Sequence, residues 1–312
     1  MNFSHLWPIT MLMRLYSLCV LLIDLSYFVL YTWIEIFLAV LHVFKPPPRK
    51  DARSEVVVIA GAARGIGREL CLEMASIGAE VVCLDVNSVG NESTVKKIRM
   101  QKGKAHAYTC DVTSREGVLK TVRTIEKDVG PISVLIHCCG VPSPRSYSSE
   151  APPIRDTLNV SIVSHFWLLD AILPKMKLRR HGHIVLLTSV AGIKNQMALS
   201  VSQFAVQGLF KSLTENIRLD RLQDDVFVSL VHLYPFIVSK DLAHDIGLRI
   251  PNLFGTMDAR LAAAKIVDAF LRNETEISIP KHVLYLGHVM RLLPKRATLM
   301  LREILDTGLD FG

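Results

Sequence analysis

One segment, residues 56–85, constrains the fold of this chain more than any other. It begins with a short β-branched run at 56–59, which is typical of a buried parallel strand. A glycine-rich stretch at 60–67 follows at once, then a helical pattern and a second strand at 81–84, which ends at Asp85. Strand, turn, helix and strand in this order predict an α/β fold with a nucleotide-binding turn.

The glycines of this turn stand where a side chain would obstruct a bound phosphate. Gly61 permits the tight bend, Gly65 lets the backbone approach a pyrophosphate, and Gly67 lets the helix pack close to the strand. The helix N-terminus adds free N–H groups and a partial positive charge. Arg64 could reach a 2′-phosphate, but Asp85 would repel one and accept ribose hydroxyls instead, so we expect NAD(H) in preference to NADP(H).

Residues 1–44 are expected to form a hydrophobic membrane anchor. The stretch 15–44 is nearly all apolar or aromatic, contributes most to the mean hydropathy of +0.32, and is long enough to span a bilayer. Asp24 and Glu35 lie on one face of such a helix, and neither carboxylate suits the centre of a lipid core. Two alternatives to a plain span therefore stay open: a helical hairpin in one leaflet, or a helix whose acidic side faces partners or water. A cleaved signal peptide fits poorly, because the apolar stretch is too long.

Residues 45–54 are predicted to be a stiff, basic, proline-rich linker. Prolines extend the chain, and cations such as Lys45 and Lys50 favour the anionic, cytosolic side of a membrane, so the next domain is expected to face the cytosol. The net charge of +7 would also suit nucleic acid, but no motif that stacks on bases or reads a groove accompanies it. We therefore expect a membrane surface, and no nucleic acid, as the partner of these charges.

Helices and strands are expected to alternate within a single domain over residues 55–280. Further strands are predicted at 105–108, 132–136, 182–189 and 226–233, and further helices at 91–101, 118–129, 154–177 and 199–221. This alternation indicates a Rossmann-like, doubly wound parallel sheet. Ligands of such folds bind at the carboxyl ends of the strands. These ends carry Gly61, Asp85, Asp111, Gly140, Ser189 and Pro235.

Several residues near these strand ends have two interpretations. Asp111 either meets the adenine amino group or is an ordinary helix N-cap or turn acid. Cys138 and Cys139 could be redox-active, but adjacent thiols bridge only with strain, and packing is the simpler role. His181 and His183 are expected to be turn and strand-edge residues, and no metal site is predicted. The expected cofactor-binding residues are Gly61, Arg64, Gly65, Ile66, Gly67, Asp85, Asp111, Val112, Cys139, Gly140, Pro235 and Ile237.

Residues 281–312 are expected to form an amphipathic C-terminal helix. Between 283 and 305, apolar side chains such as Val289 face one way and basic side chains such as Lys295 the other. Such a helix could lie on a membrane surface, cover the substrate cleft, or simply dock on the domain.

Over residues 55–280 the sequence resembles the short-chain dehydrogenase/reductase family, and within it the membrane-anchored branch of retinol dehydrogenases and lipid-droplet 17-beta-hydroxysteroid dehydrogenases. The motifs that carry the resemblance are the turn 60–67, Cys110-Asp111-Val112, Ser164-His165-Phe166-Trp167, Leu173-Pro174 and residues 181–185 leading to Ser189. The resemblance implies an NAD(P)-dependent oxidoreductase that acts on a small lipophilic alcohol or ketone, such as a retinoid, steroid or fatty alcohol. It also implies a place at the endoplasmic reticulum membrane or lipid droplets, and a homodimer.

The family's chemistry uses a tyrosine as general acid and base, a lysine four residues later, a serine, and an asparagine in a proton relay. Ser189 matches the serine, whereas Ser161 aligns with the asparagine. When the helix that follows is aligned on the family's pattern, Leu199 stands at the tyrosine position and Gln203 at the lysine position. Because leucine cannot transfer a proton, we expect activity to be weak or absent.

Two alternatives to this alignment stay open. Counting ordinary family spacing from Ser189 leads to Ser202 and Val206, which supply neither group. Tyr234 and Lys194 lie on neighbouring strand-end segments and could substitute for the missing pair. The function is therefore either that of a membrane oxidoreductase, or that of a pseudoenzyme that binds nucleotide or lipid as a regulator or scaffold. A purely structural membrane protein fits less well, because the glycine turn is intact.

Overall fold

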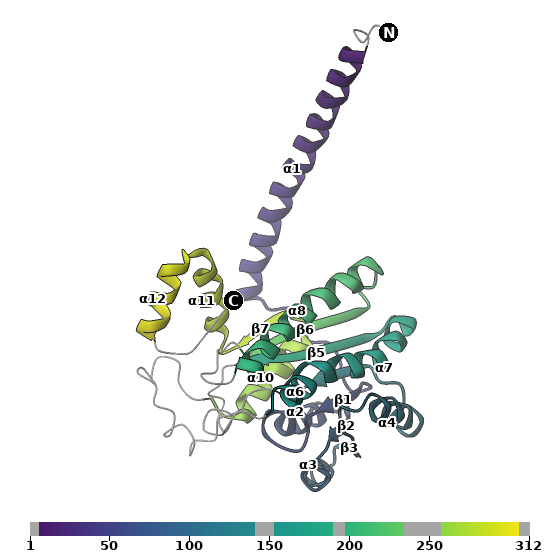
Figure 1. Ribbon diagram of the computed structural model, residues 1–312. Helices are drawn as coiled ribbons and strands as arrows, with labels where there is room; N and C mark the ends of the chain where they lie inside the picture. Colours follow the sequence, from purple (N-terminus) through teal and green to yellow (C-terminus); the bar gives the residue numbers. More distant parts are fainter. Residues whose placement is uncertain (1–5, 141–152, 190–196, 234–256, 306–312) are drawn as a thin grey trace. The chain divides into compact units, whose positions relative to one another are not determined.

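The computed structural model describes residues 6–140, 153–189, 197–233 and 257–305. The chain divides into two compact units, Met1–Arg49 and Lys50–Gly312. In the first unit, α1 runs without a break over Leu6–Phe44 (Figure 1). Its segment Met11–Leu38 has a mean hydropathy of 1.8 and is long and apolar enough to cross a membrane. The long apolar N-terminal helix is thus confirmed, and the hairpin alternative is wrong because the helix contains no turn.

A seven-stranded sheet forms the centre of the second unit. Its strands are β1 (Val56–Ala60), β2 (Glu80–Asp85), β3 (Lys104–Thr109), β4 (Val134–His137), β5 (Gly182–Ser189), β6 (Val226–Leu233) and β7 (Glu276–Ile279). Their order is β3-β2-β1-β4-β5-β6-β7, and every neighbouring pair is parallel. The order reverses between β1 and β4, which is where ligands bind in open α/β sheets. The predicted Rossmann-like parallel sheet is confirmed.

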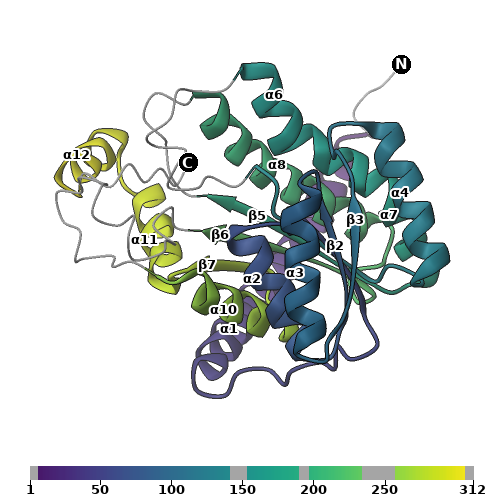
Figure 2. The same cartoon turned by 90° about the horizontal axis from the view of Figure 1, so that it is seen from below.

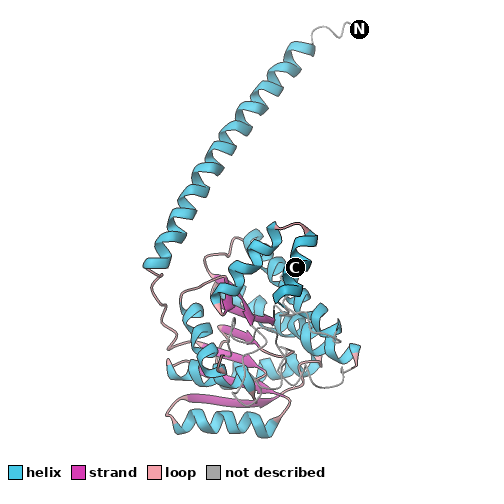
Figure 3. Cartoon of the chain, turned by 90° about the vertical axis from the view of Figure 1, so that its left-hand side faces the viewer, coloured by secondary structure: helices cyan, strands magenta, loops and turns pink. Residues whose placement is uncertain are grey.

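Helices cover both faces of the sheet (Figures 2 and 3). One face is covered by α2 (Gly65–Ser76), α3 (Ser88–Met100) and α10 (Ala259–Leu271), and the other by α4 (Arg115–Asp128), α7 (Ser164–Arg179) and α8 (Met197–Leu219). The segment Ile154–Arg179 is also long and apolar enough to cross a membrane, but α7 buries Leu168, Ile172 and Met176 in the core. It is therefore a core segment of the domain.

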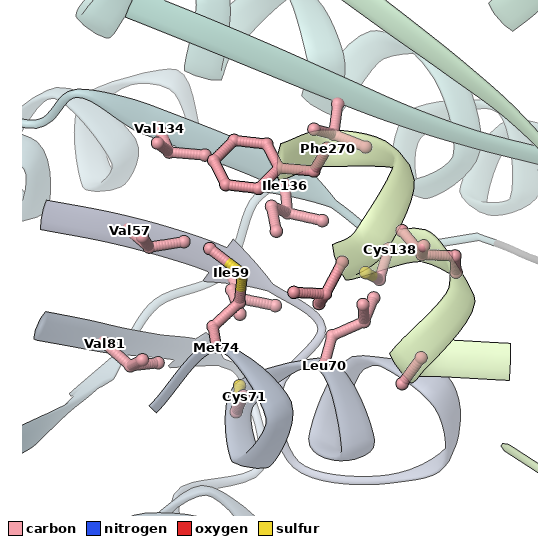
Figure 4. Packing of buried hydrophobic residues seen from close by; sticks show 14 of the residues in the cluster. Val57, Ile59, Leu70, Cys71, Met74, Val81, Val134, Ile136, Cys138 and Phe270 are labelled. Carbon is pink, nitrogen blue, oxygen red and sulfur yellow. The ribbon is translucent and has the colours of Figure 1, made fainter. Parts of the chain in front are cut away.

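The β1 run lacks polar alternation because both of its faces are buried. Val57 and Ile59 pack on the side of α2 and α10, together with Phe270 (Figure 4). Val58 and Ala60 pack on the side of α4, α7 and α8. A strand that contributes side chains to a hydrophobic core on each of its faces needs apolar residues at every position, which is the pattern found in the sequence.

The predicted helix at 154–177 is divided in the structure. A short helix, α6 (Ile154–Leu158), is followed by a π-helical turn over Asn159–Val163 and then by α7. A π-helical turn adds a residue to the helical repeat, and such turns are frequent at functional sites. This one brings Ser161 against the end of β4.

The prediction of one continuous helix over 283–305 is wrong. The segment forms two helices, α11 (Lys281–Leu292) and α12 (Lys295–Leu305). Pro294 lacks a backbone N–H and disfavours helical backbone at the preceding residue, and Leu293 is accordingly extended. The amphipathic pattern continues across a break in the backbone.

Lys50, at the end of the expected basic run, is part of the folded unit. Its N–H donates to the carbonyl of Leu271 at 2.7 Å, and its Nζ lies 2.7 Å from His183 Nδ1. The same amine lies 4.0 Å from the centre of the Phe270 ring. Burial lowers the pKa of Lys50 to about 8. The compact unit therefore begins at Lys50, before the domain start expected at residue 55.

Replacing Lys50 with Met is expected to change how stability depends on pH above 8. The pKa of Lys50 is about 8 in the folded state and 10.5 without burial, so the unfolded chain binds more protons over this interval and the folded state gains up to about 3 kcal/mol as the pH rises. Met keeps the apolar stem and removes the amine. Melting curves of both proteins from pH 7.5 to 10 test this prediction. The quantity to compare is the difference in stability between the two proteins at each pH, because buried thiols titrate in the same range and lower the stability of both proteins as the pH rises. Parallel curves would contradict the prediction.

Candidate nucleotide site

The carboxyl ends of the strands form one edge of the parallel sheet, and the predicted site residues gather there. β1 leads to Gly61 and β2 ends at Asp85. Asp111 follows β3, Gly140 follows β4, and Ser189 ends β5. Pro235 and Ile237, together with the substitutes Tyr234 and Lys194, lie outside the described residues.

The glycine turn has the shape that a bound phosphate requires. Gly61 and Gly65 have φ values of +90° and +59°, which glycine adopts without strain. A Cβ on Gly67 would lie 2.1 Å from the carbonyl oxygen of Gly61, so α2 can approach β1 this closely only without a side chain. A Cβ on Gly65 would have no described atom within 4 Å. Exposed Arg64 precedes α2 without a side-chain cap bond, and Ile66 is half-buried. The helix N-terminus therefore has room for an anion.

Asp85 is held beside this turn by two backbone groups. Its Oδ2 accepts a hydrogen bond from Ala63 N–H at 2.9 Å, and its Oδ1 accepts one from Asn87 N–H at 2.9 Å. Each carboxylate oxygen keeps a second lone pair. The half-buried carboxylate can therefore accept ribose hydroxyls without a change of orientation.

Two buried residues of α3 that the sequence analysis did not single out support the turn. Asn91 Nδ2 donates to the carbonyls of Cys83 at 2.9 Å and Tyr108 at 3.1 Å, which joins the ends of β2 and β3. Thr94 Oγ1 donates to the carbonyl of Ala62 within the turn at 3.0 Å. Polar residues three apart on the apolar face of a helix are the signal that could have identified them.

Asp111 is a turn acid in the structure. Its Oδ1 accepts hydrogen bonds from the N–H of Thr113 at 2.9 Å and from the Thr113 hydroxyl at 2.8 Å. Ser114, not Asp111, caps α4, through the N–H of Gly117. Val112 is buried beside it. The contact of this pair with adenine stays a prediction.

Gly140 packs directly against the π-helical turn. It has φ +75°, and a Cβ on it would lie 2.3 Å from Ser161 Oγ. Ser161 is buried. The end of β4 and the turn that bears the serine thus form one wall of the site.

Gln203 of α8 spans the gap between the ends of β4 and β5. Its Oε1 accepts a hydrogen bond from Ser189 N–H at 2.9 Å. Its Nε2 donates to the carbonyl of Gly140 at 3.2 Å and to Ser202 Oγ at 3.3 Å. The Gln203 side chain is 2% exposed, and the hydroxyl of Thr188 donates to its backbone carbonyl at 2.9 Å. The carboxamide thus links the segments that follow β4 and end β5 through hydrogen bonds.

The neighbours of Gln203 on α8 make other contacts. Leu199, one turn earlier, is buried. Ser202 Oγ donates to the Leu199 carbonyl at 2.7 Å, and Val206 belongs to the hydrophobic core. Of the two alignments, the one through Leu199 and Gln203 is therefore compatible with contact between α8 and the strand ends.

The cysteines near the site are poor nucleophiles. Burial raises the pKa of the Cys138 thiol, and it raises that of Cys139 to about 12. Burial likewise raises the pKa of Cys71, on α2, well above its ordinary value. Thiols that stay protonated attack disulfides slowly, which favours packing over a redox role.

The histidines carry structural contacts. His181 pairs with Glu55 at 3.1 Å, and His183 Nε2 lies 2.8 Å from Ser229 Oγ, opposite its contact with Lys50. Among residues 6–140, 153–189, 197–233 and 257–305, no group of three or more His, Cys, Asp or Glu side chains is arranged to hold a metal ion.

A stacked pair of histidines, which was not predicted from the sequence, lies where α7 packs on the end of β4. The rings of His137, at the end of β4, and His165, on α7, are 3.5 Å apart between centroids and 17° from parallel. His137 Nε2 lies 2.9 Å from Ser164 Oγ. Burial, then the neighbouring His165, keeps the pKa of His137 well below its ordinary value, and burial lowers the pKa of His165 to about 3. Both rings are neutral at physiological pH.

The sequence matches the family model described as short chain dehydrogenase over residues 55–247. The chain belongs to the short-chain dehydrogenase family. Human epidermal retinol dehydrogenase 2 is 29% identical over 272 residues, which cover 86% of this chain and 87% of the relative. Bovine short-chain dehydrogenase/reductase family 16C member 6 is 31% identical, with 85% and 80% covered, and human 17-beta-hydroxysteroid dehydrogenase 13 is 28% identical, with 88% and 90% covered.

Solved structures of other short-chain dehydrogenases share the fold. A 7 alpha-hydroxysteroid dehydrogenase, solved with NADH and 7-oxo glycochenodeoxycholic acid, has a TM-score of 0.62 at 20% identity and covers 73% of this chain and 93% of its own. A metagenomic short-chain oxidoreductase, solved with NADP, has a TM-score of 0.58 at 22% identity, with 73% and 97% covered. The chain is thus a short-chain dehydrogenase related in sequence to retinol and steroid dehydrogenases.

Proposed function

We propose that this short-chain dehydrogenase binds NAD(H), and that its oxidoreductase activity on lipophilic alcohols or ketones is weak or absent. The dinucleotide, when bound, supplies the hydride acceptor or donor. Retinoids, steroids and fatty alcohols are the proposed substrate class, in keeping with the names of the relatives. One observation carries the proposal: the neutral carboxamide of Gln203, which the family resemblance aligns with the family's lysine, hydrogen-bonds to Ser189 and Gly140.

The proposal of low activity depends on the two positions that the resemblance aligns with the family's tyrosine and lysine. Leu199, one turn before Gln203 on α8, is aligned with the tyrosine, and its side chain transfers no proton. A carboxamide carries no charge, so Gln203 could not lower the pKa of a phenol even if one were present. The loss of a positioned acid or base costs typically about 10²- to 10⁴-fold in rate. Ser189 alone can orient a substrate oxygen but cannot replace the proton transfer.

The nucleotide half of the proposal depends on Asp85. A carboxylate held by two N–H groups favours ribose hydroxyls and repels a 2′-phosphate, which supports NAD(H) over NADP(H). Exposed Arg64 is the opposing feature. The glycine turn fits a pyrophosphate because Gly65 faces open space.

The proposed location is the cytosolic side of the endoplasmic reticulum membrane or lipid droplets. The apolar length of α1 and the basic residues that follow it support this. The two C-terminal helices add exposed apolar residues such as Leu292, next to exposed Lys295 and Arg296, a combination that suits an anionic membrane surface. A homodimer, implied by the family resemblance, stays a prediction.

Calorimetric titration of the detergent-solubilised chain with NADH and NADPH tests the nucleotide site. We expect micromolar binding of NADH, tighter than that of NADPH. Gly65→Trp should abolish binding because the indole fills the space in front of the turn. Gly65→Ala is the matched control: it carries the same strain at φ +59° but adds only a methyl group, and it should weaken binding far less. A folded wild-type protein that binds neither nucleotide would contradict the proposal.

The same carboxamide favours a second candidate function, a pseudoenzyme that binds nucleotide or lipid at the membrane as a regulator or scaffold. An oxidoreductase keeps some turnover, however weak, whereas a pseudoenzyme has none. Binding of NADH without measurable oxidation or reduction of any lipophilic alcohol or ketone would favour the second.

A further inference from the structure

The carboxamide of Gln203 uses both of its donors and one of its two acceptor lone pairs within the protein. A primary amide offers two N–H donors and two acceptor lone pairs. The two donors face the carbonyl of Gly140 and Ser202 Oγ, at 3.2 and 3.3 Å. The oxygen accepts from Ser189 N–H at 2.9 Å, and the nearby Thr188 hydroxyl, at 3.4 Å, donates its proton to the Gln203 backbone carbonyl instead. Because the side chain is only 2% exposed, Gln203 cannot turn toward a ligand without leaving buried polar groups unpaired.

The polar groups available to a ligand therefore differ between the two ends of the site. At the adenosine end, Asp85 and the open N-terminus of α2 offer a carboxylate and N–H donors. At the opposite end, the α8 residues that border β4 and β5 are an aliphatic Leu199 and an internally bonded Gln203. The second ribose of a dinucleotide consequently meets no cation and no available donor from α8, among the described residues.

We propose that this site recognises the ADP portion of a dinucleotide, and that the second ribose and the nicotinamide ring contribute little to affinity. The inference rests on the proposed nucleotide site and goes further by naming the ligand class: adenosine diphosphates, with or without a ribosyl or nicotinamide extension. Gln203 is then a positioning residue that joins the ends of β4 and β5, and it makes no contact with the ligand.

Titration of the detergent-solubilised full chain with ADP, ADP-ribose and NADH separates the parts of the ligand. ADP-ribose against ADP reports the second ribose, and NADH against ADP-ribose reports the ring. We expect the three dissociation constants to agree within about threefold. NADH or ADP-ribose binding more than tenfold tighter than ADP would overturn the inference and leave the nucleotide site intact. Absence of binding by all three would instead overturn the proposed function.

Two single substitutions on α8 give a second readout. Gln203→Lys places an ammonium group between the ends of β4 and β5, and we expect it to tighten ADP-ribose and NADH by about tenfold while ADP is unchanged. Gln207→Lys, the matched control, adds the same charge one helical turn further along α8 and should leave all three affinities unchanged. Equal tightening of ADP and ADP-ribose by Gln203→Lys would contradict the inference. If that variant does not fold, the three-ligand series on the wild type still decides.

Discussion

Lowering the pH from 7.5 to 5 is expected to reduce the free energy of unfolding of the domain, with about 2 kcal/mol of the loss coming from His165. His137, His165 and His183 are all buried, and burial lowers the pKa of each in the folded state. In the unfolded chain their pKa lies near 6.5, so the unfolded state binds more protons as the pH falls. The stabilisation is complete above pH 6.5 and is lost as the pH falls toward the folded-state pKa, by about 2 kcal/mol for His165 at pH 5. His137 and His183 add to this loss in the same direction.

Urea unfolding at pH 7.5, 6 and 5 measures this loss. His165→Phe keeps an aromatic ring against His137 and removes one of the titrating groups, so it should reduce the loss by about 2 kcal/mol. The exposed His181, which pairs with Glu55, provides the matched control, and His181→Phe should leave most of the acid sensitivity in place. An unfolding free energy that does not change between pH 7.5 and 5 would show that the buried rings are protonated or accessible.

Gly140→Ala is expected to destabilise the domain by about 3 kcal/mol. A Cβ at this position would lie 2.4 Å from Ser161 Cα, a backbone atom that cannot move aside easily, and φ is +75°. Relief of the clash must displace either the end of β4 or the π-helical turn. Both changes disturb the bond from Gln203 Nε2 to the Gly140 carbonyl.

Gly208→Ala is the control for this substitution. Gly208 lies within α8, and a Cβ there would have no described atom within 4 Å. Alanine should therefore stabilise the helix by about 0.5–1 kcal/mol. Thermal melting of both variants checks the pair. Equal melting temperatures for Gly140→Ala and the wild type would contradict the close approach of Gly140 and Ser161.

The centre of the fold could be predicted from sequence because its signals are local. β1 is a continuous apolar run and β5 and β6 are mostly apolar, and the glycine turn and Asp85 follow from their spacing along a single βαβ unit. Pro294 was also a local signal of a helix break, but the amphipathic pattern continues on both sides of the proline and concealed the break. The π-helical turn changes the periodicity by a single residue, too little to detect in the pattern.

The site was less predictable where it depends on contacts between distant segments. The stacking of His137 on His165 and the bond from Gln203 to Ser189 join residues on different elements. Neither pair has a characteristic spacing, so only the packing of α7 and α8 on the sheet brings them together. Lys50 is similar, because a lysine in a basic stretch is ordinarily solvated, and here the aromatic ring of Phe270 and the ring nitrogen of His183 bury it.

The most direct test of the proposed function is the turnover of the full chain in detergent or lipid with NAD and all-trans-retinol, measured beside human epidermal retinol dehydrogenase 2. The absence of a tyrosine at position 199 and of a lysine at position 203 predicts a turnover at least about 10²-fold lower for this protein, with NADH binding retained. Turnover equal to that of the relative would contradict the central claim, and would show that another residue supplies the proton.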